Sequence, residues 1–229
     1  MCFEDEAGQS LRPPKARTWA RRGCTPVAVV SGKGSGRVSA AGLACYKPGT
    51  RSRFSYRIRL HTGRKGERRS LSEADYAELI TAAHQQLHAP VILCWDNLNT
   101  HLSGVMRTML QPHQDWLAVV QLPACAPDLN PVEGAWSTMK SSLGNLGSCN
   151  TPHRLAAIVK NRLKRIQYRP ALGDRSEHQL EDAVGVMQGD RRRARKLRVV
   201  QQRLRSQAQP DEPGHRCRGA GSQRPANPP

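Results

Sequence analysis

The sequence lacks the cysteine spacing of a disulfide framework or a zinc ribbon. Its seven cysteines are scattered, odd in number and contain no C-x-x-C pair, so both classes of protein are excluded. We interpret the cysteines as reduced thiols, mostly buried, of a cytosolic protein. Long apolar runs are also missing, which excludes a membrane span, and the first residues, MCFEDEAG, do not have the pattern of a signal peptide. We therefore expect an intracellular protein with no membrane partner.

Acidic residues are few compared with basic ones. The chain of 229 residues has 36 Lys and Arg against 18 Asp and Glu, which gives a formal net charge of +18. Part of this excess lies near the C-terminus, but the first 170 residues are basic as well. The commonest partner of such a chain is a polyanion, and nucleic acid is the leading candidate.

The spacing of apolar residues predicts both strands and helices. Residues 53–61, RFSYRIRLH, alternate between apolar side chains and mostly arginines, which is typical of a half-buried strand. Residues 89–97, APVILCWDN, are mostly apolar, which is typical of a strand buried on both faces. Further strands are expected at 1–6 (the end of a strand that looks clipped), 27–32, 37–46 and 115–123. Helices are expected at 70–88, where Ser72 and Asp75 resemble a capping box, and at 100–113, 131–143 and 151–170.

This order of elements predicts an α/β fold with a mixed sheet, because strands come first and a helix–strand–helix–strand–helix–helix series follows. The composition changes after Pro170, where apolar residues become sparse. Residues 191–198, RRRARKLR, hold six basic residues in eight, and the last residues are polar and rich in Pro and Gly. We expect one folded domain over residues 1–170 and a basic, low-complexity, disordered tail over residues 171–229.

Three carboxylates lie at the ends of predicted elements. Asp96 ends a buried strand, at the edge where open α/β sheets bind ligands, although Asp-Asn is also ordinary turn material. Glu133 lies in the first turn of a helix capped by Asn130; it either points at a bound cation or only complements the helix dipole. Asp5 ends the first strand segment, and its neighbour Glu6 competes for the same role because adjacent strand residues face opposite ways.

Carboxylates from three separate elements could converge on one site. Such a ligand set suits hard divalent cations, Mg²⁺ or Mn²⁺. Two ions about 4 Å apart would activate a water and stabilise the leaving oxygen in phosphodiester cleavage. A basic surface around the acidic pocket would admit a polyanionic substrate. The pattern therefore favours metal-dependent chemistry on nucleic acid.

Four stretches of the sequence carry a resemblance to a known family. They are FEDEAG, RPPKARTWARRGCTPV, WDNLNTH and LPACAPDLNPVEGAWSTMK. Over residues 2–170 the chain resembles the catalytic domain of DDE transposases, and within them the mariner-like insertion-sequence group, number 630 in the insertion-sequence series. The last stretch is the most specific, and the spacing between Asp96 and Glu133 is similar to that of the group.

The resemblance implies a ribonuclease-H-like fold, with a mixed five-stranded sheet flanked by helices. It implies that Asp5, Asp96 and Glu133 are the catalytic, metal-binding triad, holding two Mg²⁺ or Mn²⁺ ions. The family's chemistry is hydrolysis at a transposon end, followed by attack of the freed 3′ hydroxyl on target DNA. The implied partner is double-stranded DNA, as transposon ends and target; a homodimer remains open.

The chain also departs from the family pattern. We expect the family's N-terminal helix-turn-helix modules to be absent, and Cys125 and Ala126 stand where the family usually has an aromatic residue and a serine. The segment after Pro170 does not resemble a family ending. These departures favour a truncated element, so a DNA-binding remnant without catalysis is the alternative function.

Four further residues are candidates for contact with DNA. His101 could contact the scissile phosphate, or make a local hydrogen bond at a helix start. Lys140 follows Glu133 by two helical turns and could bind a phosphate, or be only solvated. Arg57 and Arg59 could line a DNA channel, or form a solvated cationic edge that blocks strand aggregation.

Overall fold

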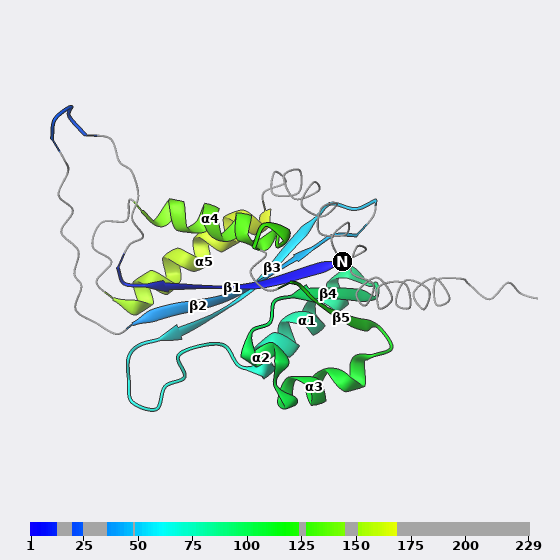
Figure 1. Cartoon of the computed structure of the whole chain (residues 1–229). Helices are drawn as coiled ribbons and strands as arrows, with labels where there is room; N and C mark the ends of the chain where they lie inside the picture. Colours follow the sequence, from blue (N-terminus) through cyan, green and yellow to red (C-terminus); the bar gives the residue numbers. More distant parts are fainter. Residues whose placement is uncertain (13–19, 25–35, 48, 124–126, 145–150, 169–229) are drawn as a thin grey trace, which may run out of the picture.

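The computed structural model describes residues 1–12, 20–24, 36–47, 49–123, 127–144 and 151–168. Within these residues the chain forms a five-stranded mixed sheet in the order β3-β2-β1-β4-β5 (Figure 1). The strands are β1 (Cys2–Ser10), β2 (Arg37–Cys45), β3 (Arg53–His61), β4 (Val91–Trp95) and β5 (Leu117–Gln121). The helices are α1 (Glu73–Leu87), α2 (Asn99–Leu102), α3 (Gly104–Leu110), α4 (Val132–Leu143) and α5 (Pro152–Tyr168), with short 3₁₀ turns η1 (Gln111–His113) and η2 (Pro127–Leu129). The predicted mixed sheet of an α/β fold is therefore confirmed.

The central strand β1 joins the two halves of the sheet. It pairs antiparallel with β2 over all nine of its residues, from Cys2 opposite Cys45 to Ser10 opposite Arg37. It pairs parallel with β4 at Cys2 and Phe3. The expected end of this strand at residue 6 was wrong, because β1 continues to Ser10. Its second half contains Gly8 and Gln9, residues of low strand propensity, and the ladder with β2 holds them in the strand.

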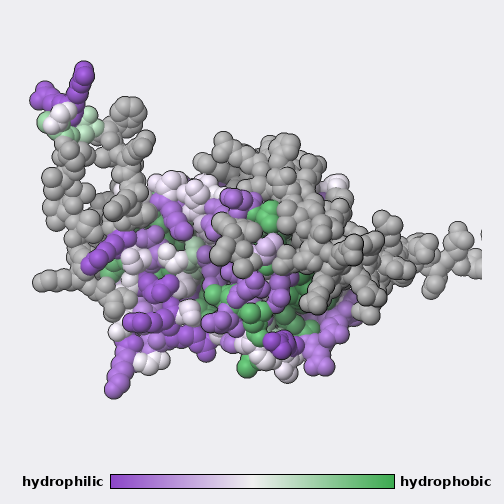
Figure 2. Space-filling view, viewed as in Figure 1, coloured by the Kyte–Doolittle hydropathy of each residue, from purple (hydrophilic) through white to green (hydrophobic). Residues whose placement is uncertain are grey.

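Helices cover both faces of the sheet (Figure 1). On one face α4 and α5 pack on a core that includes Phe3, Ala7 and Trp136. On the other face α1 and α3 pack on a core that includes Cys2 and Trp95. Described hydrophobic side chains form only small patches on the face seen in Figure 2, where hydrophilic side chains predominate.

The alternation of side chains along β1 assigns its acidic residues to opposite faces. Phe3 and Ala7 face α4 and α5, so Asp5 between them faces the same helices. Cys2 belongs to the core beneath α1 and α3, so Glu4 and Glu6 face that side. The three consecutive acidic residues of β1 therefore serve two different layers.

Gly42 allows α4 to lie close to the sheet beside Asp5. It is the residue of β2 that pairs with Asp5. A Cβ atom at Gly42 would meet Trp136 Cζ2 at 2.8 Å and Phe54 Cζ at 2.9 Å, closer than van der Waals contact permits. Glycine at this position therefore lets the buried ring of Trp136 rest on the strand.

The single helix expected over 100–113 is divided in the structure. Ser103 has extended backbone angles, φ −62° and ψ 150°, and separates α2 from α3. Its Oγ accepts a hydrogen bond from Met106 N at 3.0 Å, which satisfies a free donor in the first turn of α3. The apolar spacing continued across Ser103, and its ability to cap a new helix was overlooked.

Some predictions fall outside the described residues: the strand at 27–32, the loop residues Cys125 and Ala126, and the tail 171–229. Among the described cysteines, Cys2, Cys45 and Cys94 are buried free thiols as expected, whereas Cys24 is exposed. No helix in the described ranges is long and apolar enough to cross a bilayer.

Charged side chains join α1 to β3. The carboxylate of Asp75, which is 4% exposed, accepts hydrogen bonds from Arg57 Nε at 3.0 Å and from Arg59 Nη2 at 2.9 Å. It also accepts from Ser72 N at 2.9 Å, as the capping-box prediction expected. Burial alone would raise the pKa of Asp75, but the bonds from Arg59 and Ser72 outweigh it and hold the pKa well below its usual range.

These bonds bear on the expectation that Arg57 and Arg59 line a DNA channel. Both guanidinium groups are engaged with Asp75, and Arg57 also pairs with Glu78 of α1. The arrangement gives the two arginines a structural role that neither alternative from the sequence included.

We expect Asp75→Asn to lower the free energy of unfolding by about 1–3 kcal/mol at neutral pH, because charge-assisted bonds to two arginines are weakened. The folded-state pKa is depressed, so this stability is fully present above the ordinary Asp pKa of about 4 and is lost progressively as the pH falls from there toward the folded-state pKa. Urea unfolding of both proteins at pH 7 and at pH 3 measures this. If wild type and Asp75→Asn differ in free energy of unfolding by the same amount at both pH values, the assigned role of the Asp75 carboxylate is wrong.

Candidate active site

Acidic residues gather at the end of the β1–β4 pair. The parallel register aligns Cys2 with Leu93 and Phe3 with Cys94, and continuing it by two residues places Asp5 beside Asp96. Asp96 follows the last residue of β4, where the chain leaves the sheet toward α2. The prediction that Asp5 and Asp96 lie on adjacent strands agrees with this register.

Asp5 carries a strongly perturbed carboxyl group. Burial raises its pKa most, a backbone hydrogen bond lowers it, and the negative charges of Glu133, Glu4 and Asp96 raise it again, so that together they bring the pKa to about 7. Its Oδ2 is buried and has no hydrogen-bond partner among the described residues. A buried carboxylate near other carboxylates is destabilised unless a proton or a cation neutralises it.

Glu133 lies in the first turn of α4, and Asn130 fixes where that turn begins. Asn130 is 3% exposed, and its Nδ2 donates to the backbone oxygen of Glu4 at 2.9 Å. Its Oδ1 accepts from Val132 N at 3.2 Å, so Asn130 caps the first turn although Pro131 directly precedes the helix. The start of α4 is thereby attached to β1.

His101 lies between two carboxylates. Its Nδ1 is 3.0 Å from Asp96 Oδ1, and its Nε2 is 3.1 Å from Glu4 Oε2 in an ion pair whose geometry is not that of a hydrogen bond. The residue is 4% exposed. Burial alone would lower the pKa of His101, but contact with Glu4 and the charges of Glu6 and Asp96 raise it.

Two aromatic rings hold the imidazole of His101. Trp95 stacks on it with ring centroids 4.2 Å apart and an interplanar angle of 4°. Tyr76 meets it edge-on at 5.1 Å and 83°. Of the two roles that the sequence left open for His101, this burial and bonding favour the local hydrogen bond over direct contact with a phosphate.

Glu4 and its partnership with His101 were missed in the sequence. Glu4 is 1% exposed, and burial raises its pKa, while His101 lowers it. Burial also raises the pKa of Glu6 to about 7. The sequence did contain a clue to this contact. Glu4 follows Cys2 by two residues in a strand, so it faces the same core, and a glutamate buried there requires a partner.

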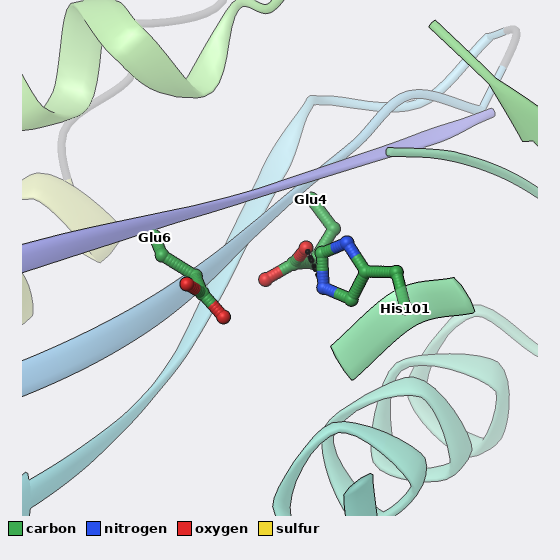
Figure 3. Close-up of side chains that lie close together, drawn as sticks. All are labelled: Glu4, Glu6 and His101. Atoms are coloured by element: carbon green, nitrogen blue, oxygen red, sulfur yellow. Dashed lines mark ion pairs between the residues drawn. The ribbon is translucent and has the colours of Figure 1, made fainter. Parts of the chain in front are cut away.

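Glu4, Glu6 and His101 form the tightest group of potential ligands (Figure 3). Each offers one ligand atom, and these atoms lie within 4.8 Å of one another. Among the described residues, Asp5, Asp96 and Glu133 do not form such a group. Two ions about 4 Å apart would allow a wider spread of ligands than one ion does.

The exposed members of the candidate site lie at its rim. The Asp96 side chain is 53% exposed, and Glu133 and Lys140 are exposed on α4. The orphaned Oδ2 of Asp5 and its raised pKa fit a cation, and a set of carboxylate oxygens suits Mg²⁺ or Mn²⁺. The residues present therefore fit the metal that the sequence predicts.

The order of the strands and the helices on both faces define the ribonuclease-H-like fold. The chain belongs to the family described as DDE superfamily endonuclease, which matches residues 1–155. No curated protein matches the sequence.

Solved structures of a mariner transposase are similar to this chain. The Mos1 transposase paired-end complex with left transposon end aligns with a TM-score of 0.55 and 15% identity, covering 89% of this chain and 55% of that chain. The Mos1 mariner paired end complexes with Mn and with Mg align with TM-scores of 0.54 at 15% and 14% identity, with the same coverage. At these identities the likeness shows the fold alone, and this chain spans about half the length of those proteins.

The raised pKa of Asp5 predicts how the stability of the metal-free protein depends on pH. Between about pH 4, the ordinary range of Asp, and about 7, the folded state binds more protons than the unfolded state, so stability falls as the pH rises. We expect Asp5→Asn to be more stable than wild type at pH 8 by about 1–3 kcal/mol. At pH 4 the difference should be much smaller.

Urea unfolding in the presence of a chelator, at both pH values, tests this expectation. The control is Asp128→Asn, which removes an exposed carboxylate of η2. If the difference in free energy of unfolding between Asp5→Asn and wild type does not change with pH, the pKa of Asp5 is not raised in the folded protein.

Proposed function

We propose that this chain is the catalytic domain of a transposase-type DNA endonuclease and strand transferase. In this proposal Asp5, Asp96 and Glu133 hold two Mg²⁺ or Mn²⁺ ions. The observation that carries it is the environment of Asp5, an orphaned carboxyl group whose pKa is raised by burial and by the charges of Glu133 and Asp96. A cation would neutralise these charges without disturbing the strands.

Both reactions of the proposed activity are in-line displacements at phosphorus. Water attacks the phosphodiester and leaves a 3′ hydroxyl, and that hydroxyl then attacks a second phosphodiester in the target. When bound, the cations would activate the attacking oxygen and stabilise the leaving one. The residues of the chain position this chemistry: Asp5 from the rigid sheet, Asp96 from the end of β4, and Glu133 from α4.

The proposed substrate is double-stranded DNA, as transposon ends and target. The net charge of +18 provides long-range attraction to a polyanion. The similar Mos1 structures are complexes with a transposon end, with Mn and with Mg, which supports the same substrate and ions here. Lys140 is exposed on the helix that carries Glu133 and is our candidate for a phosphate contact.

Nicking of a supercoiled plasmid tests the catalytic proposal. We expect the protein to nick DNA with Mg²⁺ or Mn²⁺ and not with a chelator. Asp96→Asn and Glu133→Gln should each lower the rate about 100-fold or more, because a metal ligand is lost. The matched control is Asp128→Asn, which removes an exposed carboxylate five residues before Glu133 and should nick like wild type.

DNA binding without metal separates the catalytic proposal from its alternative. We expect the affinity for duplex DNA to fall by at least about tenfold between about 50 and 200 mM salt, because bound Lys and Arg displace counterions. Asp96→Asn should bind DNA at least as tightly as wild type. Salt-dependent binding by a wild-type protein that never nicks DNA would favour the DNA-binding remnant, and affinity that does not respond to salt would argue against a DNA partner.

A further inference from the structure

Glu4 is connected to every carboxylate of the proposed triad. It directly precedes Asp5 in β1. Its side chain contacts His101, whose other ring nitrogen bonds to Asp96. Its backbone oxygen accepts from Asn130, which caps the helix that carries Glu133. One residue of the central strand is thus linked to Asp5 by sequence, to Asp96 through His101 and to the start of α4 through Asn130.

The contact between Glu4 and His101 is sealed from solvent. The Glu4 side chain is 0% exposed and that of His101 is 1% exposed. Glu4 Oε1 has no hydrogen-bond partner among the described residues. A buried carboxylate costs free energy. If these positions served only to fill the core, a pair of hydrophobic side chains would be more stable than Glu4 and His101.

The ring of His101 has little freedom to turn away from either carboxylate. Trp95 lies parallel to it and Tyr76 meets it edge-on. With the ring plane fixed, Nδ1 stays in its hydrogen bond to Asp96, and Nε2 stays 3.1 Å from Glu4 Oε2, the ion pair drawn in Figure 3. A hydrogen on Nδ1 is needed for a bond to the Asp96 carboxylate, and the charge of Glu4 next to Nε2 favours a hydrogen on that nitrogen too.

We propose that Glu4 is a positioning residue, which holds the Asp96 carboxylate through the imidazole of His101 in the orientation that binds metal. The inference rests on the proposed function, because it gives Asp96 the role of a metal ligand. Asp96 follows the end of β4 and its side chain is half exposed, so the sheet does not fix its rotamer. Its Oδ1 accepts from Leu98 N at 3.0 Å within its own turn, and the chain Glu4–His101–Asp96 adds a constraint from the core.

The same atoms allow a competing assignment, in which Glu4, Glu6 and His101 themselves bind a cation. The two assignments exclude each other at one atom, because Nε2 cannot carry a hydrogen toward Glu4 and also coordinate a metal. We favour the positioning role because both ring nitrogens already lie 3.0–3.1 Å from carboxylate oxygens, and the aromatic rings hold them there.

Mn²⁺ affinity, measured by calorimetry, tests the inference without reference to activity. We expect Glu4→Gln to weaken Mn²⁺ binding roughly 10–100-fold, as is usual when a group that orients a metal ligand is changed. His101→Gln should have an effect of similar size, and the double variant should be no weaker than either single one, because both residues act along one path. The Mn²⁺ concentration for half-maximal nicking should rise in parallel, while affinity for DNA without metal stays unchanged.

Asp75→Asn is the control for general loss of stability. It changes a buried carboxylate of α1 that pairs with arginines, and it should keep wild-type Mn²⁺ affinity at temperatures where it is folded. In an Asp96→Asn background, Glu4→Gln should cause no further loss. A further loss of tenfold there, or Mn²⁺ affinity in Glu4→Gln equal to wild type, would overturn the proposal.

Two other results would decide the matter differently. If Asp96→Asn keeps Mn²⁺ affinity while Glu4→Gln and Glu6→Gln both lose it, the cluster is itself a metal site and the positioning role is wrong. If wild type binds no Mn²⁺, no ligand needs positioning and the inference fails as well. If wild type binds Mn²⁺ but does not nick DNA, only the proposed catalysis is wrong. The Mn²⁺ affinities of the Glu4 variants still test the positioning role.

Discussion

The short parallel pairing between β1 and β4 is the constraint on which the site depends. Only Cys2 and Phe3 pair with β4, whereas β1 continues alongside β2 to Ser10. Beyond Phe3, none of the described strands pairs with this side of β1. The space is taken by Asp96 and by His101 of α2, so the point where the two strands separate is also the point where carboxylates meet.

This separation concentrates negative charge in a strongly basic chain. Glu4, Asp5 and Glu6 are consecutive, and burial raises the pKa of each. Alternation divides them between two layers, so they act in different ways: Asp5 toward α4, and Glu4 toward His101. The protein without bound metal bears the cost of this arrangement, as the proposed metal site would require if its geometry is fixed before the cations bind.

Local patterns predicted much of the fold. The apolar runs before Asp96 and before Pro123 became parallel strands, and the Ser72–Asp75 box opened α1 as expected. What failed depended on residues distant in sequence. The extension of β1 through Gly8 and Gln9 comes from pairing with β2, and no local propensity indicates it.

The candidate site was predictable to the same degree. Asp96 and Glu133 could be named because one follows a strand and the other opens a helix, whereas Asp5, which lies inside β1, was named through the family resemblance. The separations between their oxygens depend on packing that no pattern encodes. Glu4 was overlooked because an isolated glutamate in a strand does not reveal its partner, which lies 97 residues away in His101. Likewise Arg57 and Arg59 looked free until α1 was placed over β3.

Gly42 gives the site a property that none of its ligands has. Because a hydrogen atom stands where other residues carry Cβ, the indole of Trp136 rests directly on the strand opposite Asp5. This close contact keeps α4 near the sheet, and in the proposed metal site the distance between them would limit how far apart the carboxylates lie. Mg²⁺ requires oxygens at about 2.1 Å and Ca²⁺ at about 2.4 Å, so the glycine on β2 would influence which ionic radius the proposed site accepts.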